Sequence, residues 1–164
     1  MSEQDDLAQK RDAIIERIKQ AFPKSPRTKG KLRITKNSSS ASRDLKEMLE
    51  GKKWEEVMGH RSIVYRLSDA DYLFAITDEA YHYFLPAYLV DNLYNQSDSY
   101  TLAYERIRHL LSKFTLEQIE ILIAYFEFQV QAFRNERYTN KDHFEAIDDM
   151  LLRLMLRRDE LAKD

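Results

Sequence analysis

The residues of this chain that could carry acid–base or metal chemistry gather between positions 69 and 82. Four carboxylates in this stretch could form a general acid and base pair: Asp69, Asp71, Asp78 and Glu79. Glu79 and His82 also make one Glu-x-x-His step, whereas a helical di-iron site needs two such steps and two more carboxylates. Glu105 and His109 have the wrong spacing to supply the second step. We therefore expect no metal and no cofactor, and we keep a carboxylate-based hydrolase or ligand-binding enzyme near Asp69–His82 as an alternative.

No residue has the sequence setting of a catalytic nucleophile. The chain has no cysteine, which excludes thiol nucleophiles, thiolate metal sites and disulfides. A serine nucleophile needs an exposed elbow with glycines, and the serine-rich run 38–42 has no glycine nearer than Gly30 and Gly51. There is no glycine-rich phosphate loop either. We therefore predict no catalytic residue.

A basic segment follows the first predicted helix. It contains six bases and no acid: Lys24, Arg27, Lys29, Lys31, Arg33 and Lys36. Such a segment could contact nucleic acid, but single-strand binding usually places aromatic residues among the bases, and this segment has none. The whole chain has a net charge of −2. A nucleic-acid accessory role for residues 24–36 is therefore a second alternative, and nucleic acid is not the partner that we expect.

The main concentration of unusual side chains is aromatic. Eight of the ten tyrosines lie between Tyr65 and Tyr104, around Pro86. A tyrosine has an apolar body and a polar tip, which suits both the edge of a core and a protein interface, so both interpretations stay open. In the interface interpretation the predicted partner-binding residues are the following: Tyr81, Tyr83, Tyr88, Tyr94, Asp78, Glu79 and Asp91.

The elements that must position these residues are helices. The chain has 164 residues, 43% of them hydrophobic and 33% charged, which fits one domain with a real core. Three glycines and three prolines are too few for the turns of an all-β fold. The acidic N-terminus lacks the pattern of a signal peptide, and no apolar run approaches the ~20 residues that span a bilayer. We expect a cytoplasmic protein with no membrane contact, and its oligomeric state stays open.

The predicted fold is a single compact all-α domain of six to seven helices with a mobile basic loop after the first helix. The predicted boundaries are a helix at 1–22, a flexible loop at 23–41 and a helical core domain at 42–164. Within the core, Pro86 should occupy the first turn of a helix over 86–94, because a first-turn amide has no helical partner to lose. Thr115-Leu-Glu-Gln118 is a capping box that opens the strongest helix. Residues 61–67 could be helix or strand, and Trp54 should be buried against residues 83–89.

Four segments in this order resemble a family of small bacterial helical proteins of unknown function. They are Gly51-Lys-Lys-Trp54-Glu-Glu-Val57, the segment 75–89 with its Tyr-Phe-Leu-Pro-Ala-Tyr-Leu end, the polar loop 95–99, and Phe114-Thr-Leu-Glu-Gln118. The family hallmark is a Tyr-Tyr-Leu-Pro-Ala-Tyr-Leu segment, and this chain has Phe84 in place of the second tyrosine. The resemblance covers about residues 42–130. It implies a compact helical domain and does not point to any particular activity.

The sequence therefore favours a non-enzymatic protein-binding domain. Its most specific form is an inhibitor or immunity-type protein that masks a bacterial toxin or effector. This interpretation depends on a small, slightly acidic, cysteine-free chain that has candidate aromatic contacts and no catalytic constellation. A protein partner is expected, and the sequence does not identify it.

Overall fold

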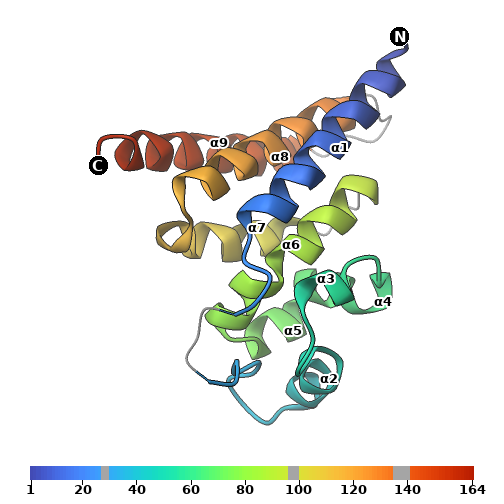
Figure 1. The fold of residues 1–164 in the computed structure, drawn as a ribbon, viewed down its shortest axis with the longest axis vertical. Helices are drawn as coiled ribbons and strands as arrows, with labels where there is room; N and C mark the ends of the chain where they lie inside the picture. The colour runs from blue at the N-terminus through green and yellow to red at the C-terminus, as the bar shows by residue number, and fades with distance from the viewer. Residues whose placement is uncertain (27–29, 96–99, 135–140) are drawn as a thin grey trace. The chain divides into compact units, whose positions relative to one another are not determined.

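The computed structural model describes residues 1–26, 30–95, 100–134 and 141–164. These residues form nine α-helices and two short 3₁₀ helices, in the order shown in Figure 1. Within the described residues there is no strand, only one isolated bridge between Thr35 and Ile76. The all-α prediction is confirmed, and the described α-helices outnumber the six to seven expected. No helix in the described part of the chain combines the length and the apolar character that a membrane crossing needs.

The chain divides into two compact units. Unit 1 contains residues Met1–Ala21 and Ile107–Asp164, and unit 2 contains Phe22–Arg106. The first helix therefore belongs with the last two helices, while residues 23–41 belong with the middle of the chain.

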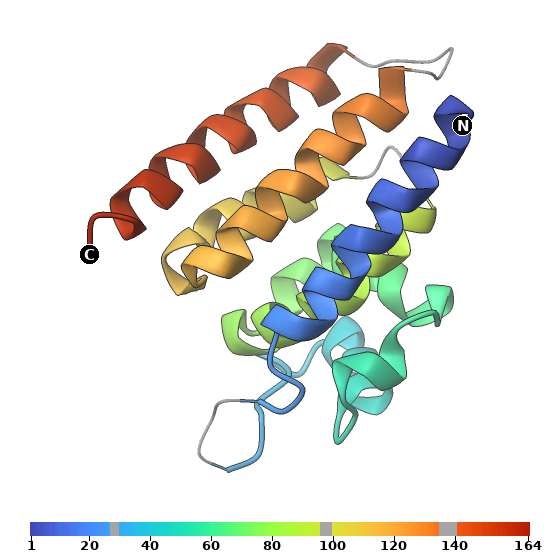
Figure 2. The same ribbon diagram turned by 45° about the horizontal axis from the view of Figure 1, so that its top comes forward.

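Unit 1 is built around α8. It contains α1 (Glu3–Ala21), the 3₁₀ helix η2 (Leu111–Lys113), α8 (Leu116–Arg134) and α9 (Lys141–Leu161). Helix α8 packs against both α1 and α9, and Figure 2 shows it between them. The predicted capping box is confirmed: the Gln118 amide donates to Thr115 Oγ1 at 3.2 Å, and Gln118 Oε1 accepts from the Thr115 amide at 3.0 Å. Gln118 also donates to the Ala21 carbonyl at 3.2 Å, which ties the end of α1 to the start of α8.

Unit 2 is built around α6 (Asp78–Tyr94), which buries 12 of its 17 residues. Two short helices and a 3₁₀ helix pack on it: α3 (Trp54–Val57), α4 (Arg61–Val64) and η1 (Tyr65–Ser68). Helix α2 (Ser40–Leu49) packs on α5 (Ala70–Ala75), and α7 (Tyr100–His109) begins in this unit. Residues 61–67, which the sequence left open, are helical.

The prediction for Pro86 is wrong. Pro86 is trans but lies inside one continuous helix, with no separate element over residues 78–84. A proline in a helix interior removes one backbone hydrogen bond. Helix α6 buries 12 of its 17 residues, including every residue from Tyr83 to Val90, so apolar contacts around Pro86 hold the helix together across that missing bond. Tertiary packing here overrides the local preference of proline for the first turn of a helix.

The predicted mobility of residues 23–41 is not confirmed. Ser40 and Ala41 belong to α2, and Ser39 caps that helix by accepting from the Ser42 amide. Farther back, the Thr77 amide donates to the Ile34 carbonyl at 3.0 Å, and the Lys36 amide donates to the Ala75 carbonyl at 2.8 Å. These backbone bonds join Ile34 and Lys36 to the end of α5 and the start of α6.

Candidate functional site

The structure buries most of the predicted aromatic interface. Tyr81, Tyr83 and Tyr88 are buried, whereas Tyr94 is 56% exposed. The Tyr81 hydroxyl donates to the Ala103 carbonyl at 3.4 Å, and the Tyr83 hydroxyl donates to the Lys24 carbonyl at 2.9 Å. Burial raises the pKa of both hydroxyls. Of the two interpretations that the sequence left open, burial favours the core for these three tyrosines, because they lie on a helix that buries 12 of its 17 residues.

The three predicted acids of that interface have different surroundings. Asp78 accepts from Arg106 Nη2 at 2.7 Å, and Glu79 is exposed. Asp91 is half-buried near the end of α6 and accepts from the Asn95 side chain at 3.3 Å. Burial raises the pKa of Asp91, against the lowering effects of Asn95 and Arg61. The seven predicted residues therefore do not form one exposed surface.

The Asp91→Asn variant should be slightly more stable than the natural chain at neutral pH. A carboxyl whose pKa is raised on folding binds its proton more tightly in the folded state, so its stabilising contribution is present at low pH. That contribution is lost as the pH rises from the unfolded value of about 4 through the raised folded value. An acid in the last turn also opposes the helix dipole. Urea denaturation of both proteins should give equal free energies of unfolding near pH 3 and an advantage to the variant at pH 7. An advantage that appears only at low pH would contradict this.

Two of the four carboxylates of the enzyme alternative, Asp69 and Asp78, have structural partners. Asp69 caps α5 by accepting from the Asp71 amide at 3.0 Å. Asp78 is paired with Arg106, as described above. Within the described residues no group of three or more histidines and acids is placed to hold a metal ion.

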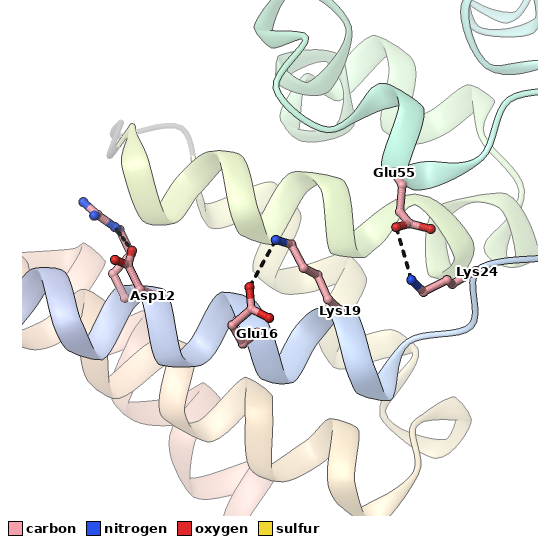
Figure 3. Close-up of polar contacts among 6 residues, drawn as sticks. Asp12, Glu16, Lys19, Lys24 and Glu55 are labelled. Atoms are coloured by element: carbon pink, nitrogen blue, oxygen red, sulfur yellow. Dashed lines mark hydrogen bonds and ion pairs between the residues drawn. The ribbon is translucent and has the colours of Figure 1, made fainter.

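The basic segment is also engaged with its own unit. Lys24 pairs with Glu55 at 3.4 Å, as Figure 3 shows, and Lys31 pairs with Glu50. Arg33 donates to the Thr35 carbonyl at 3.1 Å and to the Lys36 carbonyl at 3.2 Å. Arg27 and Lys29 lie outside the described residues. Because Lys24 and Lys31 pair with acids, these two lysines offer less charge to a phosphate backbone than the sequence suggested.

The surface that sequence reasoning missed is a pocket in unit 2 of about 470 Å³. It lies where residues 37–44, the entry and first turn of α2, meet α5. Phe74 lines it and is 76% exposed, compared with 56% for Tyr94 and 49% for Tyr65. An exposed phenylalanine has no polar tip to satisfy, so it marks a contact surface more strongly than an exposed tyrosine does.

The pocket is acidic. Asp44 and Asp71 both line it, together with Tyr72. The Tyr72 hydroxyl donates to Asp44 at 3.2 Å, and the Arg66 guanidinium lies 5.4 Å from the Tyr72 ring centre. Asp71 is exposed, and among the described residues its carboxylate has no partner. The pocket lining contains no basic side chain among the residues described.

The polar rim of the pocket is held in place by its own hydrogen bonds. The Ser39 amide donates to Asn37 Oδ1 at 3.0 Å, and the Ser42 hydroxyl donates to the same oxygen. These bonds fix the entry to α2. The pocket therefore has one rigid polar side and one aromatic side.

Comparison of the chain with protein-family models, with curated proteins and with solved structures gives no match.

Proposed function

We propose that this protein acts by binding, and that its pocket in unit 2 holds an arginine or lysine side chain of a protein partner. The observation that carries the proposal is Phe74, which is 76% exposed and lines a pocket of about 470 Å³ whose charged lining residues are the carboxylates Asp44 and Asp71. A long basic side chain is the ligand with matching chemistry, because its stem is apolar and its head is cationic.

The two halves of the pocket suit the two halves of such a side chain. The Phe74 ring offers an apolar face for the stem and a π face for the charge. Asp71 offers an unpaired carboxylate for the head, and Asp44 is oriented by the Tyr72 hydroxyl. Together the two carboxylates, Asp44 and Asp71, would also speed the approach of a basic partner.

An inhibitor or immunity-type role is the narrower form of this proposal. Masking a toxin or effector requires a tight stoichiometric complex and no turnover. The support for it is the acidic pocket together with the structural engagement of Asp69 and Asp78. A bacterial partner would present a basic residue at the centre of its contact surface.

The binding site should respond to Phe74→Ala and Asp71→Asn. The probe is a short capped peptide, Gly-Phe-Arg-Gly, titrated into the isotope-labelled full chain while amide shifts are followed by NMR. We expect saturable shifts at residues 39–44 and 71–75. Phe74→Ala should weaken binding by about 0.5–2 kcal/mol, because it removes the cation–π contact. Asp71→Asn should also weaken binding and reduce its dependence on salt.

Tyr94→Ala is the matched control, since Tyr94 is the exposed aromatic residue of the original interface prediction. It should leave the titration unchanged. A peptide with glutamate in place of arginine should not bind. The proposal fails if both peptides bind alike, or if Tyr94→Ala weakens binding while Phe74→Ala does not.

A further inference from the structure

Helix α9 exposes an apolar patch on one side. Leu152 and Leu156 are 59% and 56% exposed. They are four residues apart, so they lie on one face of the helix, one turn from each other. The other side of α9 buries His143, Ile147, Met150 and Leu154, and the helix packs on α8. The helix therefore has apolar residues on a second face, in addition to the face that packs on α8.

The exposed residues around this patch include more acids than bases. The exposed residues of α9 other than the two leucines are Lys141 and six acids: Asp142, Glu145, Asp148, Asp149, Asp159 and Glu160. The three arginines of the helix are half-buried, and each pairs with an acid of the same helix, as Lys141 does with Glu145. The helix therefore has six acids against four bases, and acids lie on both sides of the leucine patch along the helix.

We infer that this face of α9 docks an amphipathic helix of a partner protein, with apolar residues at i and i+4 and lysines or arginines beside them. An amphipathic helix recognises a groove or face through anchors at this spacing. The surrounding carboxylates select a partner whose flanking residues are basic. A second copy of this chain fits less well, because two α9 faces would bring exposed acids against exposed acids.

This inference does not depend on the pocket. The patch lies in unit 1 and the pocket in unit 2, and they share no residue. The two proposals can fail independently, because the pocket is tested with variants of Phe74 and Asp71 and the α9 face with variants of α9 itself.

The experiment measures binding of a labelled 18-residue peptide of leucine and lysine, patterned as an amphipathic helix, to the full chain by fluorescence anisotropy. A matched peptide carries glutamate in place of each lysine. We expect saturable binding of the lysine peptide and none of the glutamate peptide. Equal binding of the two peptides would overturn the inference.

Variants then locate the site. The double variant Leu152→Ser, Leu156→Ser should weaken binding at least about tenfold, since it removes two apolar contacts. Glu145→Gln with Asp148→Asn should weaken binding several-fold and flatten its salt dependence. The matched charge control is Asp12→Asn with Glu16→Gln on α1, where both acids are exposed; it should leave binding unchanged.

Two results would count against the inference. One is unchanged affinity in the leucine variant, with its folding verified by circular dichroism. The other is a dimer in sedimentation that the leucine variant abolishes, because a second copy would then be the occupant of this face.

Discussion

Replacing Trp54 with alanine should destabilise the protein by roughly 3–5 kcal/mol, the usual cost of removing a large buried ring. Trp54 is fully buried and begins α3, which packs on α6. Its indole nitrogen donates to the Pro23 carbonyl at 2.8 Å, across 31 positions of sequence. The substitution therefore opens a cavity beside α6 and removes the donor of a carbonyl in the segment that precedes α2.

The measurement is urea denaturation followed by circular dichroism. Trp54→Phe keeps part of the ring volume, loses the N–H donor and leaves a smaller cavity, so it should cost less than Trp54→Ala, about 1–3 kcal/mol. Phe74→Ala is the surface control and should change stability by no more than about 0.5 kcal/mol. A midpoint that Trp54→Ala leaves unchanged would show that the ring is not part of the core.

The burial of Trp54 could be predicted from the sequence, and so could the cap at Thr115. The cap depends on two residues three positions apart, and the helix that follows has a clear apolar stripe. Information of this kind is local, so tertiary structure has little opportunity to override it. The all-α class follows in the same way from the shortage of glycine and proline.

Whether the tyrosines are buried or exposed could not be predicted from such local patterns. Tyrosine suits both core and interface, and only the surroundings decide between them. One signal was present in the sequence: apolar residues occur at nearly every position of 80–93, which is typical of a helix that is buried on all sides. That pattern would have predicted both the burial of Tyr81 and the continuity of α6 through Pro86.

The pocket had no local signal at all. Its two sides come from residues 37–44 and 71–75, and only the packing of α2 on α5 brings them together. Phe74 follows Tyr72 and Leu73 on a helix of six residues. Such a short helix cannot bury three consecutive large side chains, since they point in different directions. The sequence shows that one must be exposed but does not show which.

Replacing Arg106 with methionine should cost roughly 3 kcal/mol, the sum of two hydrogen bonds from a charged donor. The Arg106 side chain is only 13% exposed. Its guanidinium donates to the carbonyls of Leu73 and Ile76, each at 2.9 Å, and pairs with Asp78 at 2.7 Å. It therefore joins α7 to the end of α5 and to the first turn of α6. Methionine keeps much of the apolar stem but leaves the two carbonyls without this donor.

The contribution of each partner can be separated by further variants. Arg106→Lys keeps the charge but lacks the planar fork that serves several acceptors at once, so it should recover only part of the loss. Asp78→Asn should cost at most about 1 kcal/mol, because Asp78 is 47% exposed and solvent weakens the pair. Lys31→Met removes an exposed ion pair with Glu50 and should have almost no effect. If Arg106→Met were no more destabilising than Lys31→Met in urea denaturation, the two carbonyl bonds would not support unit 2. If Asp78→Asn reproduced the full loss, the ion pair with Asp78, and not the bonds to the Leu73 and Ile76 carbonyls, would be the main contribution of Arg106.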